Sequence, residues 1–167
     1  QFQLKLFEEI ELNGKDLSLK FYGTRALMAL RLEKNWGAWT LDFRPDFTAA
    51  ESGLDVFINW KKDFIGKEAS LSEKKQGVKK KLVTMTIDTK DIDVTNDEAI
   101  LKNNKCVGYI TSGGYAHHVK KSMALGYVPE KFSKHETSLD VEINGKLYSA
   151  HVTDRPLYDA NGEKMRI

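Results

Sequence analysis

The feature that most constrains the fold is a series of short alternating segments in the second half of the chain. In the first of them, Val83, Met85 and Ile87 are apolar and the residues between them are threonines. This period of two is typical of a strand that buries one face. Asn144 and Gly145, between two later segments, are the pair that a two-residue type I′ hairpin prefers. The predicted strands cover residues 83–87, 105–112, 122–128, 139–143 and 147–153. Short strands at this spacing predict a small antiparallel barrel or sandwich.

The first half has a different pattern, with helices separated by loops. Apolar residues at helical spacing predict helices over residues 2–13, 24–35 and 66–76. Alternation over residues 54–59 predicts one strand. The helix over residues 24–35 is apolar on more than one side, which is typical of a helix buried between layers. A lysine-rich stretch over residues 74–81 is predicted to be a solvated linker. The first half therefore mixes helix and strand in an α+β manner.

Length, charge and cysteine content narrow the class of protein. At 167 residues the chain is long enough for two small domains, which we expect over residues 1–77 and 78–167. The net charge of +2 is too small to indicate nucleic acid as a partner. No apolar run approaches the ~20 residues that span a bilayer, and no secretory signal opens the chain, so no membrane partner is expected. Cys106 is the single cysteine, so an internal disulfide and a zinc site are excluded and a reducing, cytoplasmic compartment is predicted.

Three motifs favour structural roles over chemistry. His117 and His118 are adjacent, so on a strand their side chains point to opposite faces and cannot easily bind one metal ion. The Ser-Gly-Gly motif of residues 112–114 lacks the spacing of a phosphate-binding loop, and a turn or bulge is favoured over an anion nest. Cys106 is expected in or near the core. The residues alone therefore predict no metal site and no catalytic group.

Two tryptophans and two arginines are the candidates for ligand contact. Trp36 and Trp39 follow the second predicted helix in a glycine-containing loop, where an indole either packs over the helix end or stacks on a flat ligand. Packing is the commoner use. Arg25 and Arg31 lie on that helix, and a buried arginine needs an anionic partner. The candidates for that partner are a ligand, Glu33, Asp42 and Glu51.

A set of motifs occurs in order along most of the chain: Gly23–Ala26, Leu30–Lys34, Ala38–Trp39, Glu51–Leu54, Asp63–Lys67, Val107–Tyr115, Ala124–Pro129 and Pro156–Asp159. Together they resemble the aminomethyltransferase family, which includes the glycine-cleavage T-protein and the folate-binding halves of dimethylglycine and sarcosine dehydrogenases. The forms of several motifs are closer to the dehydrogenase branch. The resemblance implies an α+β fold in which a ferredoxin-like lobe precedes an antiparallel jelly-roll-like β-barrel. This chain would hold the C-terminal part of that lobe and the barrel.

The resemblance also implies a chemistry and a set of ligand contacts. In the family, tetrahydrofolate accepts a one-carbon unit from an amine, assisted by an aspartate and by a glutamate that holds the pterin ring. Both residues belong to segments upstream of this chain, and the family's Gly-Tyr-Thr-Gly-Glu motif has no match here. Because the chain also starts at Gln1 rather than methionine, we expect a portion of a longer protein with no catalytic residue of its own. The implied folate contacts are Arg25, Trp39 and Tyr158, whereas Arg31 and Glu33 are expected to form a buried structural pair.

Three functional hypotheses follow. The first is the C-terminal portion of a folate-dependent aminomethyltransferase unit, with tetrahydrofolate as cofactor and FAD held only by a separate domain of a parent dehydrogenase. Its partners would be the upstream segment of the same protein and the folate. The second is a non-catalytic folate-binding or interaction module, in which case the chain is not an enzyme. The third is part of a free glycine-cleavage T-protein, which implies a lipoyl carrier protein as a partner.

Overall fold

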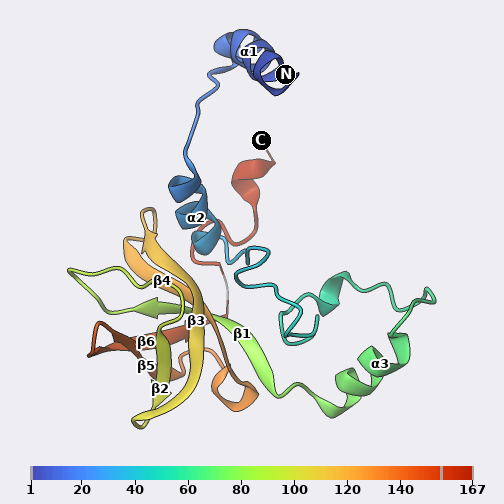
Figure 1. Cartoon of the computed structure of the whole chain (residues 1–167), viewed down its shortest axis with the longest axis vertical. Helices are drawn as coiled ribbons and strands as arrows, with labels where there is room; N and C mark the ends of the chain where they lie inside the picture. The colour runs from blue at the N-terminus through green and yellow to red at the C-terminus, as the bar shows by residue number, and fades with distance from the viewer. Residues whose placement is uncertain (1, 155, 167) are drawn as a thin grey trace.

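The computed structural model describes residues 2–154 and 156–166, and its second half is a closed antiparallel barrel (Figure 1). The strands are β1 (Lys80–Ile87), β2 (Ala99–Lys102), β3 (Lys105–Ala116), β4 (Lys121–Pro129), β5 (Ser138–Ile143) and β6 (Lys146–Thr153). Their order around the barrel is β1-β4-β3-β2-β5-β6, and β6 pairs with β1 to close it. The α+β fold class with a C-terminal barrel is therefore confirmed.

Turn and bulge residues set the register of the barrel. Asn144 and Gly145 join β5 to β6 with φ angles of 49° and 75°, as a type I′ turn requires. The β3–β4 register shifts between Ile110 and Ser112, immediately before the Ser-Gly-Gly motif, whose own residues pair in register with β4. The motif is thus part of a continuous strand next to a bulge, and is not itself the predicted turn or bulge. A side chain at Gly113 would place its Cβ 2.6 Å from a Val94 methyl carbon, which explains the glycine there.

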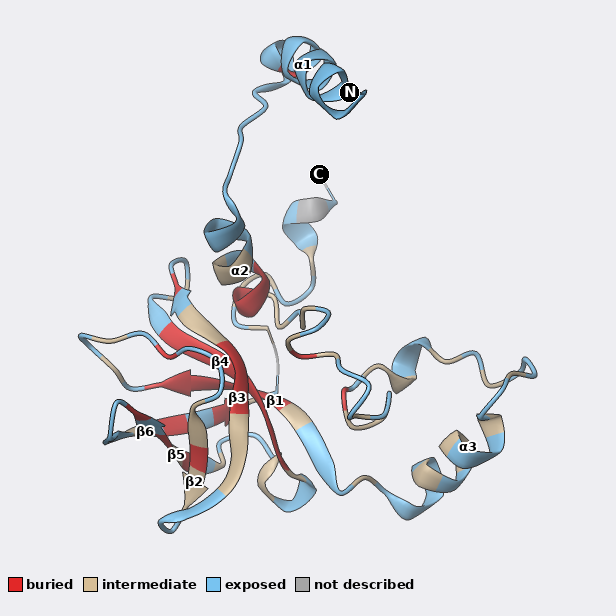
Figure 2. Cartoon of the chain, viewed as in Figure 1, coloured by how far each residue is buried: buried red, intermediate tan, exposed pale blue. Residues whose placement is uncertain are grey.

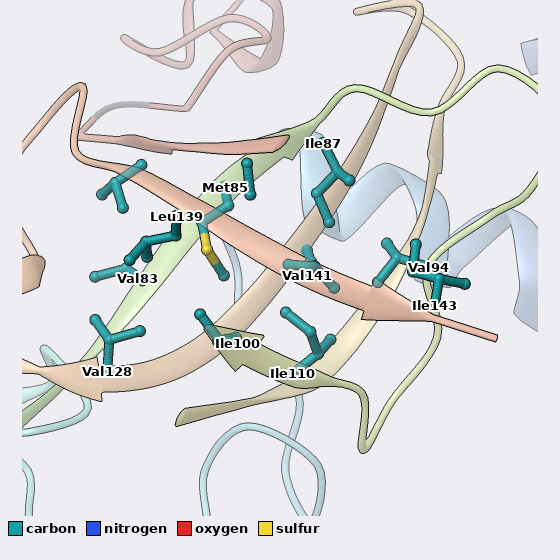
Figure 3. Close-up of a cluster of buried hydrophobic side chains, with 13 residues drawn as sticks. Val83, Met85, Ile87, Val94, Ile100, Ile110, Val128, Leu139, Val141 and Ile143 are labelled. Atoms are coloured by element: carbon teal, nitrogen blue, oxygen red, sulfur yellow. The ribbon is translucent and has the colours of Figure 1, made fainter. Parts of the chain in front are cut away.

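The core lies inside the barrel, where alternate residues of every strand converge (Figure 3). Met85, Ile100, Ile110 and Val141 are completely buried there. Because burial of one such side chain contributes on the order of 1.5–3 kcal/mol, the barrel interior is the main source of stability in the described chain.

The helices lie outside the barrel. They are α1 (Phe2–Gly14), α2 (Thr24–Glu33) and α3 (Lys67–Gln76), with short 3₁₀ turns η1 (Lys15–Leu17), η2 (Asp55–Phe57), η3 (Glu130–Phe132) and η4 (Glu163–Met165). Helix α1 stands away from the barrel, and its apolar side chains are exposed (Figure 2). Only the last turn of α2 is buried, beside β3 and β4. The expectation that the whole second helix is buried between layers is therefore wrong.

Further predictions are corrected by the structure. The strand predicted over residues 54–59 is wrong: the segment contains the 3₁₀ turn η2 in a loop, where no described strand pairs with it and Val56 is 77% exposed. The lysine-rich stretch of residues 74–81 is exposed as predicted, but most of its residues belong to the end of helix α3 and the start of strand β1 and do not form a linker. Cys106 is exposed, not in the core, because it lies at the outer end of β3. No described helix has the length and apolar character needed to cross a bilayer.

Candidate functional site

A buried carboxylate organises the loop that follows α2. Asp42 is fully buried, and its Oδ2 accepts hydrogen bonds from Arg31 Nη1 at 2.6 Å and from the Ala38 backbone N–H at 2.7 Å. Its Oδ1 accepts from Ser112 Oγ at 2.6 Å and from the Thr111 hydroxyl, both on β3. Buried charges are stable only when paired and hydrogen-bonded in this way. Asp42 therefore fixes the loop of residues 34–43 against α2 and the barrel.

Arg31 pairs with Asp42 and not with Glu33, so the predicted Arg31–Glu33 pair is wrong. Both side chains are buried, as expected, but they face different neighbours. Arg31 Nη1 also donates to the Trp36 carbonyl at 3.1 Å. Its Nε and Nη2 are buried without a hydrogen-bond partner among the described residues. Asp42 is thus the anion that balances this guanidinium within the described chain.

Tyr127, on strand β4 of the barrel wall, extends the same network through its hydroxyl group. Its hydroxyl donates to the Asp42 carbonyl at 2.9 Å, which leaves the Tyr127 oxygen to accept from Ser52 Oγ at 2.7 Å. Burial, opposed in part by the Ser52 hydrogen bond, raises the pKa of Tyr127 to about 12. The Phe47 ring stacks on the tyrosine ring with an interplanar angle of 9°. Two loop segments, at residues 42–47 and 52, are thereby held on the barrel wall.

An apolar hollow of about 450 Å³ opens on this network. Trp39, Phe43, Phe47 and Leu54 give it aromatic and aliphatic walls, and Arg44 lies at its edge. Trp39 is 76% exposed and meets Phe43 edge-on at 5.5 Å, so its indole face is available to a ligand. Hollows of this size and character suit a flat, largely apolar ring. Trp39 therefore does not pack over the helix end, which is the commoner use of such a residue.

The C-terminal end of α2 carries a second polar cluster. The Glu33 carboxylate is almost fully buried and accepts two hydrogen bonds from His118, one from the backbone N–H and one from ring Nδ1, both at 2.7 Å. The His118 ring lies 4.6 Å from the Tyr158 ring, centroid to centroid. The Tyr158 N–H in turn donates to the Glu33 carbonyl at 3.2 Å. This cluster joins α2, the β3–β4 turn and the C-terminal segment.

The three residues implied as folate contacts occupy different places. Trp39 lines the apolar hollow, and Tyr158 lies against the end of α2. Arg25 is exposed in the first turn of α2, eight residues before Glu33. At 1.5 Å per residue it lies roughly 12 Å along the helix axis from the end where Tyr158 docks. The structure thus brings Tyr158 to α2 but does not gather all three residues around one hollow.

The sequence alone does not predict the organising roles of Asp42 and His118. Asp42 was one of several possible partners for a buried arginine, and its four donors come from three separate segments. His118 stands out in the sequence only as a possible metal ligand beside His117. Its hydrogen-bond partner, Glu33, lies 85 residues away along the chain. The motifs Leu30–Lys34, Ala38–Trp39 and Val107–Tyr115 lie beside these two residues along the chain, but neither residue belongs to a motif.

Comparison with known families matches both parts of the chain. Residues 1–62 match the model of the GCVT N-terminal domain, and residues 80–159 match the model of the glycine cleavage T-protein C-terminal barrel domain. The chain belongs to the glycine cleavage T-protein (aminomethyltransferase) family.

Individual relatives agree with this assignment. The chain is 40% identical over 154 residues to human mitochondrial dimethylglycine dehydrogenase, covering 91% of this chain and 18% of that protein. It is 36% identical over 141 residues to an aminomethyltransferase of Picosynechococcus sp., covering 83% of this chain and 39% of that protein. A crystal structure of the glycine cleavage system aminomethyltransferase T from Bartonella henselae superposes with a TM-score of 0.77 at 25% identity, over 84% of this chain and 40% of that one. The chain thus spans less than half the length of these relatives.

Proposed function

We propose that this chain is the C-terminal part of a tetrahydrofolate-dependent aminomethyltransferase unit, in which a one-carbon unit passes from an amine to tetrahydrofolate. The observation that carries the proposal is the order of the family matches, with the N-terminal domain over residues 1–62 followed by the barrel domain over residues 80–159. The remainder of the unit would be supplied by the upstream part of the same protein. We also propose a folate-binding lobe over residues 1–77 and a barrel domain over residues 78–167.

The proposed amine is dimethylglycine or sarcosine. Identity to human dimethylglycine dehydrogenase is 40% over 91% of the chain, against 36% over 83% for the cyanobacterial aminomethyltransferase. In such a protein a flavin bound by a separate domain would oxidise the amine. The alternative is a glycine-cleavage unit, in which the aminomethyl group arrives on a lipoyl carrier protein. The cytoplasmic location stays a prediction, since the human relative is named as a mitochondrial protein.

The apolar hollow supports the folate part of the proposal. Its indole and phenyl walls at Trp39, Phe43 and Phe47 fit a flat ring by stacking and edge contacts. It presents few side chains that could pair with the polar edge of a pterin, so the isolated chain should bind folate weakly. Holding the ring and excluding water from one of its faces would be this chain's contribution, because positioning two reactants is itself a large part of catalysis.

The test uses the longest natural protein that contains this chain. Formation of methylenetetrahydrofolate is measured with dimethylglycine, with sarcosine and with an aminomethyl-loaded carrier protein. Trp39→Ala should raise the KM for tetrahydrofolate about fivefold, since an aromatic contact contributes about 1 kcal/mol. The matched control is Trp60→Ala, a loop tryptophan that lines a different hollow beside Lys74.

The three hypotheses predict different results. Turnover with dimethylglycine or sarcosine supports the dehydrogenase branch, and turnover only with the loaded carrier supports the glycine-cleavage alternative. If no amine donor yields methylenetetrahydrofolate, the proposal is wrong and a non-catalytic binding module takes its place.

A further inference from the structure

Three places in the chain have an asparagine followed by a glycine, and one of them is the tip of the last hairpin. They are Asn13–Gly14, Asn144–Gly145 and Asn161–Gly162. In such a pair the backbone nitrogen of the glycine can attack the carbon of the asparagine amide, because glycine has no side chain to hinder the approach. The attack is fastest where neither the glycine N–H nor the asparagine amide is held by a hydrogen bond.

The pair between β5 and β6 meets both conditions within residues 2–154 and 156–166. The Gly145 N–H has no hydrogen-bond partner there, and neither has the Asn144 side chain. Both residues are exposed, and a Cβ built at Gly145 would have no atom within 4 Å. The two reacting groups are therefore free and open to water.

The other two pairs are held by hydrogen bonds. The Gly162 N–H donates to the Asp159 carbonyl at 2.9 Å, and the Asn161 amide donates to Glu163 Oε1 at 3.3 Å. In the last turn of α1 the Asn13 amide donates to a main-chain oxygen one turn earlier, at 2.7 Å. Each of these contacts has to break before the glycine nitrogen can attack.

The turn between β5 and β6 also permits the geometry of attack. Asn144 and Gly145 have φ angles of 49° and 75°, as in a type I′ turn. Rotation of the peptide unit between them gives a type II′ turn, which fits a two-residue hairpin equally well and has a ψ angle of about −120° at its first central residue. This ψ angle brings the Gly145 nitrogen to the same side as the Asn144 Cβ, and glycine accepts the accompanying change of φ. The attack therefore does not require β5 to separate from β6.

We propose that Asn144 is a site of spontaneous deamidation, at which the hairpin between β5 and β6 is modified as the protein ages. The Gly145 nitrogen forms a bond to Asn144 Cγ, and the Cγ–NH2 bond breaks. The proton that the nitrogen loses leaves with the NH2 group as ammonia, and a five-membered succinimide remains. Water then adds to one of the two ring carbonyl carbons and opens the ring to aspartate or isoaspartate. Water is the co-reactant, and nothing is oxidised or reduced.

The two products affect the hairpin differently. Aspartate followed by glycine suits a type I′ turn as well as asparagine does, so this product retains the fold. In isoaspartate the main chain runs through Cγ and gains a methylene group, which lengthens a turn that holds two residues. The register of Ile143 against Lys146 depends on the length of this turn. Isoaspartate therefore loosens the adjoining ends of β5 and β6.

The test follows all three pairs in one sample of the longest natural protein that contains this chain. Trypsin places them in separate peptides, residues 6–15, 135–146 and 147–164, and each peptide contains one asparagine. The protein is incubated in mildly alkaline buffer, and conversion is measured as the mass change from NH2 to OH in each peptide. Asn144 should convert at least about fivefold faster than Asn13 or Asn161, since that is the effect of one hydrogen bond that must first break.

Two controls separate structure from sequence. In urea the three pairs lose their different surroundings and should convert at similar rates. Asn144→Gly cannot deamidate and leaves a Gly-Gly pair that a type I′ turn accepts. Hydrogen exchange at the ends of β5 and β6 should therefore quicken in wild type as isoaspartate accumulates, and should stay constant in Asn144→Gly.

The inference is overturned if Asn13 or Asn161 converts as fast as Asn144 in the folded protein, or if Asn144 does not convert. It is also overturned if the difference between the pairs persists in urea, because the folded turn is then not its cause. Exchange that stays constant in wild type while isoaspartate accumulates would likewise contradict it. None of these outcomes depends on folate, so the proposed function is tested separately.

Discussion

Replacing Asp42 by asparagine tests whether one buried carboxylate organises the candidate site. The substitution keeps the shape of the side chain and removes its charge. The amide can direct its carbonyl toward Arg31 and Ala38 and its NH2 toward Ser112 and Thr111, whose hydroxyls can rotate to accept. The positive charge of the Arg31 guanidinium is then left unbalanced, because this side chain is only 8% exposed and has no second anion among the described residues.

The expected loss follows from that geometry. Removing one partner of a buried ion pair costs about 3–5 kcal/mol, and the retained hydrogen bonds favour the lower end of this range. With a urea slope of about 2 kcal/mol per M, a loss of 3 kcal/mol lowers the unfolding midpoint by about 1.5 M. The assay is urea unfolding of both proteins, followed by circular dichroism and by tryptophan fluorescence.

A matched control lies four residues further along the same loop. Asp46 pairs with Arg44 at 2.6 Å, but these side chains are 58% and 40% exposed. Exposed pairs contribute about 0–1 kcal/mol, so Asp46→Asn should barely move the midpoint. If Asp42→Asn and Asp46→Asn differ by less than about 1 kcal/mol, burial does not govern the Arg31–Asp42 pair and the reasoning fails.

Three further predictions concern the barrel and the C-terminal segment of residues 156–166. Because the pKa of Tyr127 is raised from 10.0 to about 12, its contribution is complete below pH 10 and is lost as the pH rises toward 12. Wild type should therefore lose about 2 kcal/mol over that interval, and an equal loss in Tyr127→Phe would contradict this. Burial alone would raise the pKa of Asp159, but hydrogen bonds from the Glu163 backbone and from Lys34 lower it below its usual value. The ion pair between Lys34 and Asp159, which holds residues 156–166 against α2, should thus persist above the ordinary carboxyl pKa and weaken as the pH falls below it. Hydrogen exchange of residues 156–166 should show this pH dependence in wild type and not in Asp159→Asn. Gly126→Ala should destabilise the protein by about 1–3 kcal/mol in thermal unfolding, because its Cβ would lie 2.7 Å from the Tyr109 carbonyl oxygen, and a wild-type melting curve would refute that crowding.

The barrel was largely predictable because several of its strands have an apolar pattern with a period of two or are joined by a recognisable turn. Alternation predicts β1 and β5, the Asn144–Gly145 pair predicts the turn and with it the return strand β6, and β3 and β4 correspond to two further short segments expected to be strands. Strand β2 was missed because Ala99–Lys102 is too short to show a period. The same rule failed at residues 54–59, where apolar residues alternate but no strand lies alongside. Alternation reports a possible strand, whereas pairing depends on neighbours elsewhere in the chain.

The candidate site was less predictable because its contacts join distant segments. Nothing local distinguishes Asp42 from the other carboxylates near Arg31, since two of its donors, Thr111 and Ser112, lie 69 and 70 residues away. The Glu33–His118 contact has the same character. The family resemblance points to Trp39 and Tyr158 as candidate ligand contacts. The residues that hold them come from distant parts of the chain and are known only from the structure.

The closure of the barrel limits how this protein can associate with others. Each of the strands β1 to β6 has a neighbour on both sides, although the β1–β6 and β2–β5 ladders are short, so no described strand has one side wholly free for a foreign peptide. Addition of a foreign strand along a whole edge, and edge-to-edge association of folded copies, are therefore not expected of the described barrel. Any assembly of this domain then relies on side-chain surfaces, and most of the exposed large apolar residues lie on α1, α2 and the loop segments, with Tyr115 on β3 and Leu147 on β6 as the strand members. The barrel is then a rigid support, and contacts with other molecules fall to the helices and loops that it carries.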